Sequence, residues 1–339
     1  MAEFNLHDYA QTFMPNGQEY PIARVLDQSD PVVRDALLIE SNSDSGHEYA
    51  VQNGLPKAMW RQAYQGVTPT KGSQTVVKEA YGRMSAVSIV DVALAEKGGN
   101  VKEIRANMKR DKLEVMAQEF AHKFFYGSAQ DNEKAFVGFA KRYSEKSAKS
   151  GSQIVDAGGT QANKQTSIYL VGWGRNKIYT FFPKGMKAGI HTYDYSANGP
   201  IDLQDANGDD FPGYKEQLEW CVGLAVQDWR YGARVCNIEN PASMNKAAKI
   251  ALYENFITAV GKIRNLETCH LVAYCSRDTK DALRAGFMAA GGQSSPIVYQ
   301  RDNLNKTGND RYGLFRDLVI DGIQIKADDA IVHTEAVVA

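Results

Sequence analysis

The chain has few cysteines, almost no net charge and no long apolar run among its 339 residues. Four cysteines are too few for a disulfide framework in a chain of this size, so we expect reduced thiols in the core. A formal net charge of −1 gives no electrostatic basis for tight binding to nucleic acid. No window predicts a membrane span, and the start MAEFNLHDYA lacks the basic and apolar regions of a signal peptide.

Motifs for catalysis and ligand binding are missing as well. The sequence has no phosphate-loop pattern and no nucleophile elbow. The segment GWGRNK at 172–177 has two close glycines, but it lies between expected strands and does not open a helix, unlike a dinucleotide fingerprint. We therefore predict no catalytic residue, no cofactor and no metal, and a chain that is not an enzyme.

Two segments resemble metal sites only at first sight. In a strand, alternate residues point to opposite faces, so Cys269 and Cys275 share one face and His270 points to the other. Core thiols are therefore expected there instead of a zinc site. The Asp-rich segment 202–210 would place a leucine and a tyrosine at the first and last ligand positions of a calcium loop, so we expect an Asx-rich turn.

The clearest predicted element is a long one-sided helix that ends at Tyr126. Asn100 and Glu103 have the spacing of a capping box, and Gly127 is expected to be a left-handed C-terminal cap. The helix would be roughly 40 Å long at 1.5 Å per residue. Its apolar positions recur at multiples of four: Ile104, Met108, Met116, Phe120 and Phe124.

The stretch HKFFYGSAQDNEKAFVGFAKRY (122–143) leaves two interpretations of Gly127 and Gly138. They could belong to a ligand loop or end a structural helix. Since no ligand motif accompanies them, we expect Gly127 to end the helix and Gly138 to permit close backbone packing. Three aromatic residues are expected to anchor the turn that follows: Phe136, Phe139 and Tyr143.

The second half of the chain predicts strands first and then a mixed α/β part. Residues 144–165 are small and polar, which indicates a surface loop, and 166–239 favour a largely antiparallel sheet. A second α/β subdomain is expected from Pro241, with Ser276 as an N-cap and a hairpin turn at Asp321-Gly322.

Residues 53–72, NGLPKAMWRQAYQGVTPTKG, form a turn-rich insert between two strand-like segments. The insert nevertheless holds large apolar side chains, among them Leu55, Met59, Trp60 and Tyr64. A two-stranded excursion is only marginally stable alone. The pattern leaves two alternatives open: the insert folds back onto its own domain, or it packs on another chain.

Several segments, read in order, resemble the major capsid proteins of tailed phages. NGLPKAMWRQAYQGVTPTKG resembles their extended loop, and MAQEFAHKFFYGSAQDNEKAFVGFAKRY resembles their spine helix with the aromatic-glycine piece after it. TSIYLVGWGRNKIYTFFPKGMKAGI and GLAVQDWRYGARVCNIE resemble their peripheral-domain strands, and VIDGIQIKADDAI resembles the closing strands of the axial domain. The most similar type is the coat protein of epsilon-fifteen-like short-tailed phages.

This resemblance implies an α+β fold of the Hong Kong 97 type, with a long spine helix, an extended β-hairpin loop, an antiparallel peripheral sheet and an α/β axial domain. The implied parts are an N-terminal arm (1–45), the extended loop (46–90), the peripheral domain (91–239, with the spine helix at 101–126) and the axial domain (240–339). One departure from the type member concerns the order of the parts. There the axial domain precedes the last peripheral strands, whereas here the peripheral-looking strands, 166–239, precede the helices of 240–290.

The resemblance also implies a function in assembly. Hexamers and pentamers would form the icosahedral head that encloses double-stranded DNA. The contacts between the coat protein and the DNA would be non-specific. A decoration or cement protein and the portal are further implied partners; no membrane is involved. The protein would be made in the host cytoplasm and reside in the virion. We expect contacts to a neighbouring subunit from the extended loop, at Leu55, Pro56, Met59, Trp60 and Arg61.

Two other functions remain as alternatives. A soluble α/β enzyme of unknown chemistry would need a cleft with perturbed titratable groups, and the sequence offers no candidate. Another phage structural part, such as a tail or portal component, would also self-associate but would not share the order of extended loop and spine helix.

Overall fold

The computed structural model describes residues 30–43, 46–97, 101–128, 135–205, 207–290 and 318–338. The helices are α2 (Pro31–Asp35), α3 (Val92–Lys97), α4 (Val101–Tyr126), α5 (Phe139–Arg142), α6 (Lys246–Lys262) and α7 (Arg277–Ala289), with 3-10 turns η1 (Lys149–Gln153), η2 (Trp229–Tyr231), η3 (Pro241–Ser243) and η4 (Leu266–Thr268). The strands are β1 (Leu38–Glu40), β2 (His47–Gly54), β3 (Ser73–Glu79), β4 (Gly82–Asp91), β5 (Ile154–Asp156), β6 (Gln165–Trp173), β7 (Ile178–Phe182), β8 (His191–Asp194), β9 (Ile201–Gln204), β10 (Asp210–Val226), β11 (Gly232–Glu239), β12 (His270–Cys275), β13 (Leu318–Ile320) and β14 (Ile323–Ala327). Most of the predicted N-terminal arm and Asn100 of the predicted capping box lie outside the described residues.

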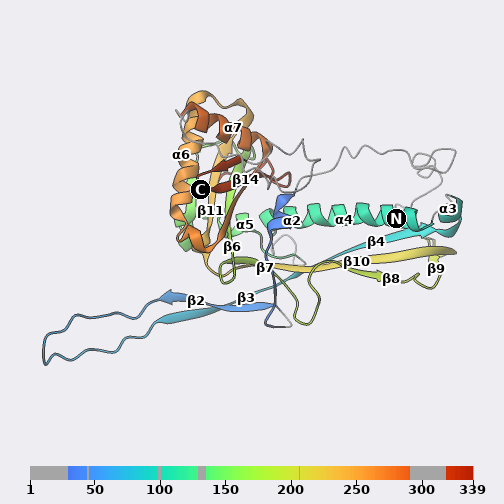
Figure 1. Ribbon diagram of the computed structural model, residues 1–339, viewed down its shortest axis with the longest axis horizontal. Helices are drawn as coiled ribbons and strands as arrows, with labels where there is room; N and C mark the ends of the chain where they lie inside the picture. Colours follow the sequence, from blue (N-terminus) through green and yellow to red (C-terminus); the bar gives the residue numbers. More distant parts are fainter. Residues whose placement is uncertain are drawn as a thin grey trace, which may run out of the picture.

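Three parts are visible in Figure 1. The long helix α4 runs along β4 and β10, and a unit with α6 and α7 lies at one end of α4. The hairpin of β2 and β3 projects away from both. Within the described part of the chain, one large sheet connects the first two parts, whereas β2 and β3 form a sheet of their own.

Helix α4 covers β4 and β10 with the apolar side that its four-residue spacing predicts. Met116, Phe120 and Phe124 are buried, and the ring of Phe120 lies 4.7 Å from that of Trp220 on β10. Strand β10 pairs antiparallel with β4 over ten residues of each strand, from Gly213–Asp91 to Val222–Gly82. Truncating one such buried phenylalanine typically costs about 3–5 kcal/mol. The long helix predicted at 101–126 is therefore confirmed.

The unit with α6 and α7 has a core of its own, against one face of β6, β11 and β12. Strand β12 alternates as predicted: Leu271, Ala273 and Cys275 join this core, whereas Val272 and Tyr274 join the core beneath α4. Because the sheet strands carry apolar residues on both faces, a single sheet serves two cores.

Hydrogen bonding in the sheet continues across residue 240. Strand β6 pairs with β11 on one side and with β12 on the other, and β12 pairs with β14. Strands β6 and β11 therefore share a sheet with the strands that follow Pro241. The domain boundaries given by the sequence remain predictions.

The glycines of the segment after α4 support packing, although one of them differs from expectation. Gly127 is not among the glycines with a positive φ, so the left-handed cap is wrong. Instead, the Gly138 amide donates to the Gly127 carbonyl at 2.8 Å, and a Cβ on Gly138 would lie 2.5 Å from the Gly127 nitrogen. The two backbones thus touch, and Phe136, Phe139 and Tyr143 are buried as predicted.

The polar segment 144–165 is more ordered than the predicted surface loop. It contains η1 and the short strand β5, whose Ile154 and Val155 are buried. Strand β5 pairs parallel with β11, about eighty residues later in the chain. Pairing with a distant strand explains why a composition-based interpretation missed this strand.

Candidate functional site

The hairpin of β2 and β3 carries the loop that the sequence singles out. The two strands pair antiparallel from His47–Glu79 to Gly54–Ser73, with an irregularity between Gln52 and Gly54. Beyond Gly54 the chain has no regular strand until Ser73, and this loop forms the far end of the projection in Figure 1. All five predicted contact residues therefore lie on one extended arm.

A few local hydrogen bonds shape the loop. The hydroxyl of Thr70 accepts from the Lys57 amide at 2.8 Å and donates to the Lys57 carbonyl at 3.1 Å, which holds the two sides together. At the tip, the Gln65 amide donates to the Gln62 carbonyl at 3.2 Å, and Tyr64 has a φ of 65°. Arg61 donates to the Gln65 carbonyl at 3.3 Å. The tip is thus a defined turn.

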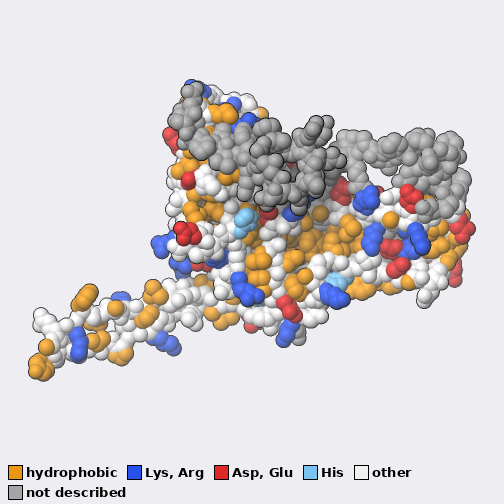
Figure 2. All heavy atoms as spheres, in the orientation of Figure 1, with side chains coloured by type: hydrophobic (Ala, Val, Ile, Leu, Met, Phe, Trp, Pro, Cys, Tyr) orange, Lys and Arg blue, Asp and Glu red, His pale blue; other side chains and the backbone are white. Residues whose placement is uncertain are grey.

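The apolar side chains of the loop face solvent. Trp60 is 102% exposed, Tyr64 107% and Leu55 77%, and Met59 and Val67 are exposed as well. Figure 2 shows apolar groups along the whole arm. A loop folded onto its own domain would cover these groups, so the subunit does not satisfy them by itself. Tyr64 and Val67 join the five predicted residues, and their position in the same turn-rich insert is the signal for both.

The loop is also purely basic in its charged residues. Between 53 and 72 the charged side chains are Lys57, Arg61 and Lys71, with no aspartate or glutamate. Because all three carry the same charge, they favour a surface with acidic or carbonyl groups over another copy of the same loop.

At its root the hairpin is attached to the body by buried polar contacts. Arg142 of α5 donates to both carboxylate oxygens of Glu79, at 2.6 and 2.8 Å. Tyr49 on β2 packs in a small cluster with Tyr179 and Phe181, and its hydroxyl lies 3.0 Å from Glu79. The sequence gives no signal for this site, because Glu79 and Arg142 are distant in the chain and follow no motif.

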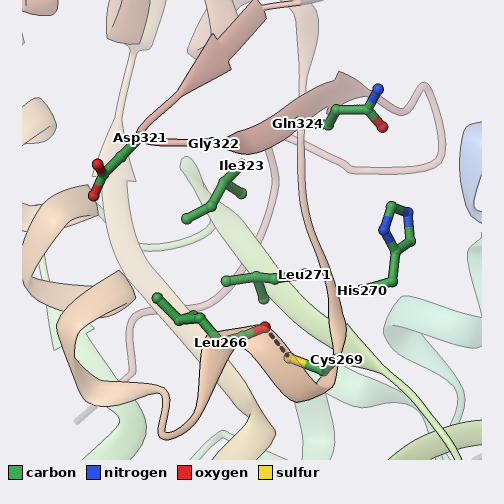
Figure 3. A pocket seen from close by; sticks show the side chains of 8 residues that line it. All are labelled: Leu266, Cys269, His270, Leu271, Asp321, Gly322, Ile323 and Gln324. Carbon is green, nitrogen blue, oxygen red and sulfur yellow. Dashed lines mark hydrogen bonds between the residues drawn. The ribbon is translucent and has the colours of Figure 1, made fainter.

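A separate cavity of about 380 Å³ lies at the ends of β12 and β14 (Figure 3). Its polar side chains do not converge: Asp321 and His270 lie on opposite sides. The Cys269 sulfur lies 3.6 Å from the Leu266 carbonyl, and burial raises the pKa of this thiol, which disfavours the reactive thiolate. The cavity therefore holds no arrangement typical of an active site.

The Asp-rich segment and the strand from Cys269 to Cys275 are the two segments that resemble metal sites in the sequence. Among the described residues, no group of three or more histidine, cysteine, aspartate and glutamate side chains could hold a metal ion. Asp205 accepts hydrogen bonds from the amides of Asn207 and Asp209, at 2.7 and 3.0 Å, so an Asx-type turn begins at Asp205, whereas Asp202 lies in β9 and Asp210 begins β10. The described helices include none that is both long and apolar enough to cross a bilayer.

Comparisons with known proteins agree with this architecture. A structure of bacteriophage epsilon15 matches with a TM-score of 0.66 and 24% identity, over 100% of this chain and 98% of the phage chain. This likeness shows the fold, so the predicted Hong Kong 97-type fold is confirmed. The bacteriophage JBD30 capsid is more distant, with a TM-score of 0.44 and 8% identity over 78% of this chain and 82% of the other, and adds nothing to the assignment.

Sequence comparisons give the family. A search of curated proteins found no match. The family model described as major capsid protein GP7 matches residues 14–339. The chain therefore belongs to the major capsid protein GP7 family, and it is a phage coat protein that assembles with copies of itself into the head of the virion.

Proposed function

We propose that the loop 53–72 joins neighbouring copies of this coat protein into rings of six and five, which close into the icosahedral head around double-stranded DNA. The observation that carries the proposal is the full exposure of Trp60 and Tyr64 on a projecting arm. Solvent contact of this kind is unfavourable for large aromatic side chains, and docking on a second copy removes it.

Burial of the aromatic side chains makes a large free energy available for docking. An aromatic side chain buries about 150–250 Å², which at roughly 25 cal/mol per Å² corresponds to about 4–6 kcal/mol before the costs of association. Leu55, Pro56 and Met59 add apolar area beside Trp60, and Arg61 adds a charge-assisted donor. Each copy contributes one such arm, so the gain repeats around a ring.

The shape of the arm favours rings over pairs. A projection on one copy that docks on a different surface of the next copy is a heterologous contact, which closes into a ring when the rotation between copies allows it. A basic loop, with Lys57, Arg61 and Lys71, disfavours contact with itself and so supports this head-to-tail arrangement.

Replacing Trp60 by alanine tests the proposal. Because the side chain is fully exposed in the single subunit, Trp60→Ala is expected to leave the thermal unfolding of the unassembled subunit unchanged. Loss of a buried interface tryptophan typically costs at least about 2 kcal/mol per copy, so shells should be few or fragile. Negative-stain microscopy and the melting temperature of assembled particles give the two readouts.

A matched control keeps the result specific. Leu266 is 41% exposed on η4, far from the arm in sequence, and Leu266→Ala is expected to assemble normally. Shells of normal yield and thermal stability from Trp60→Ala would contradict the proposal. A lower melting temperature of the unassembled Trp60→Ala subunit would indicate that the loop packs on its own body.

We further infer that the coat protein acts by assembly alone, without catalysis. The side chains around the cavity of Figure 3 do not converge on one point, and the buried carboxylate Glu335 accepts from partners in the core. A near-neutral chain suits loose, non-specific contact with packaged DNA, because a strongly basic lining would bind it tightly. Synthesis in the host cytoplasm, and contacts with a decoration protein and the portal, belong to the same proposal.

A further inference from the structure

The projecting hairpin needs a device that fixes its direction. Strands β2 and β3 pair only with each other in the described part of the chain, and a two-stranded ribbon bends and twists easily. The direction of the loop is therefore set at the root, where the hairpin meets β7, β10 and α5.

Arg142, Glu79 and Tyr49 form what we call the root triad. Arg142 binds Glu79 with two parallel hydrogen bonds of 2.6 and 2.8 Å, and their side chains are only 18% and 12% exposed. The same guanidinium donates to the carbonyls of Leu224 at 3.1 Å and Val137 at 3.3 Å. One side chain thus ties the hairpin to β10 and to the segment before α5.

Tyr49 connects β2, the other strand of the hairpin, to the same point. Its hydroxyl lies 3.0 Å from Glu79 and 3.1 Å from the Val226 carbonyl, and it donates its single proton to one of them at a time. Burial, and secondarily the charge of Glu79, raise the pKa of Tyr49, so the hydroxyl keeps that proton. Both strands are therefore held through one carboxylate.

A buried ion pair contributes little net stability, but a bidentate pair restricts the relative orientation of its two side chains. Removing two charges from water offsets most of their attraction, whereas the planar fork of an arginine donates to both oxygens of a carboxylate in only a few orientations. Arg142 and Glu79 lie in different elements, α5 and β3, so this preference fixes the angle between the hairpin and the body.

We propose that Arg142 is a positioning residue for assembly, which holds the arm in the direction that lets its loop reach the neighbouring copy. The inference rests on the proposed docking of loop 53–72. Arg142 does not touch the neighbour; it acts through Glu79 and Tyr49.

The length of the arm makes the root decisive. The tip lies about fifteen residues beyond His47, at most roughly 50 Å at about 3.3 Å per residue, so a swing of about 10° at the root moves the tip by roughly 9 Å. A displacement of that size separates the loop from a receiving surface altogether. If only about one arm in ten points in the correct direction, the apparent affinity of the loop for the neighbouring copy falls about tenfold.

The experiment compares Arg142→Met, which keeps the aliphatic stem, with Lys78→Gln as a matched control. Lys78 also forms an ion pair in the hairpin, with Glu48 at 3.3 Å, but both side chains are about half exposed. Pulsed spin-label distances, between Gly66→Cys at the tip and Lys112→Cys on α4, report the direction of the arm in unassembled full-length subunits. Both positions are open, and the half-buried Cys269 is changed to serine in every sample.

We expect Arg142→Met to broaden the distance distribution at least twofold and to raise the concentration needed for assembly about tenfold, whereas Lys78→Gln changes neither. A merely structural role would lower the melting temperature without broadening the distribution in the folded subunit. Glu79→Gln, which retains the shape and one acceptor, should give a smaller effect in the same direction. The Glu79→Gln/Arg142→Met double variant should be no worse than Arg142→Met.

The outcomes separate this inference from the proposed function. A narrow distribution and normal assembly in Arg142→Met, with assembly impaired in Trp60→Ala, overturn the positioning role and leave loop docking intact. Normal assembly in both variants overturns loop docking and the inference with it. Should Arg142→Met not fold, Glu79→Gln decides: an unchanged distance distribution there rejects the proposal.

Discussion

At the scale of single residues, two glycines show how backbone contact depends on a missing side chain. A Cβ on Gly138 would lie 2.5 Å from the Gly127 nitrogen and 2.7 Å from the Lys123 carbonyl oxygen. Gly138→Ala is therefore expected to destabilise the subunit by about 1–3 kcal/mol, as overpacking typically does. Urea unfolding followed by circular dichroism measures the change.

A second glycine supplies the opposite control. Gly261 lies within α6, and a Cβ there meets nothing within 4 Å. Since glycine in a helix is about 0.5–1 kcal/mol less favourable than alanine, Gly261→Ala should stabilise the subunit by up to that amount. Equal effects of the two substitutions would refute the argument from backbone contact.

His47 predicts a pH dependence of stability. Its ring is buried beside Tyr179 and Phe181, and burial lowers the pKa of His47 below its usual 6.5 despite the nearby Glu79. The unfolded chain thus takes up the proton first, so this group's contribution to stability is present above pH 6.5 and is lost as the pH falls toward the folded-state pKa.

The matching variant is His47→Gln, which can still hydrogen-bond to the Tyr179 hydroxyl. Between pH 7.5 and 5.5 the free energy of unfolding of this variant should fall less than that of the natural protein. The slopes of unfolding free energy against pH should differ between the two proteins by at most about 1.4 kcal/mol per pH unit, which is the value for one proton. Chemical unfolding at a series of pH values measures it, and identical slopes would exclude His47 as the titrating group.

Residue roles differ in how far the sequence reveals them. The packing role of Gly138 could be predicted because aromatic residues surround it and no ligand motif does. The backbone conformation of Gly127 could not: the predicted left-handed cap is wrong, because the chain leaves α4 with Gly127 packed against the Phe136 backbone. The pairing of Arg142 with Glu79 depends on tertiary structure and leaves no local pattern.

At the scale of elements, the strongest local signals are those that the structure confirms. The four-residue spacing gives α4, and Asp321 and Gly322 adopt φ values of 54° and 77°, as the predicted tight turn of β13 and β14 requires. Ser276 is the N-cap of α7 as expected. Strand β5 cannot be predicted locally, since three residues in a polar segment carry too little periodicity and gain their order from pairing with β11.

Helix α6 offers a test of one such local signal. The Asn245 side chain accepts from the Ala248 amide at 2.8 Å and so satisfies a free donor at the start of the helix. Asn245→Ala should cost about 1 kcal/mol of unfolding free energy, whereas Asn245→Gly should cost only a few tenths. Urea unfolding measures both; an unchanged free energy of unfolding in Asn245→Ala would show that the cap does not act through this hydrogen bond.

At the scale of the whole molecule, long-range pairing decides what the sequence alone leaves open. Composition changes near Pro241, yet the sheet continues from β6 to β12 across that point. The sequence likewise does not decide whether loop 53–72 is exposed, because a turn-rich insert with apolar residues fits either a folded-back or a projecting arrangement. The order of segments resembled a known capsid fold, and that resemblance supplied what periodicity could not.

One buried carboxylate joins the parts of the subunit. Glu335, near the C-terminal end, accepts from Tyr126 at the end of α4 at 2.6 Å and from Tyr169 on β6 at 2.9 Å. Arg234 on β11 donates to it at 2.7 Å, and Ser167 donates to it as well. Arg234 also donates to the carbonyls of Ala140 and Tyr143. The C-terminal segment thereby ties the long helix to the sheet of the α6 and α7 unit.

The last prediction concerns this connection. Arg234 and Glu335 are each 5% exposed, so Glu335→Gln leaves a buried guanidinium without its counter-charge and should destabilise the subunit by about 3–5 kcal/mol. Replacing both partners, as Arg234→Met/Glu335→Leu, removes the charge together with its partner and should recover much of that loss. Chemical unfolding of the single and double variants measures both. The pair Arg277–Asp329, whose arginine side chain is 65% exposed, provides the comparison, since Arg277→Gln should cost less than about 1 kcal/mol. A double variant as unstable as Glu335→Gln would mean that the avoidance of an unpaired buried charge is not the main effect, and that the hydrogen bonds from Tyr126, Tyr169 and Ser167 to Glu335 hold the long helix to the sheet.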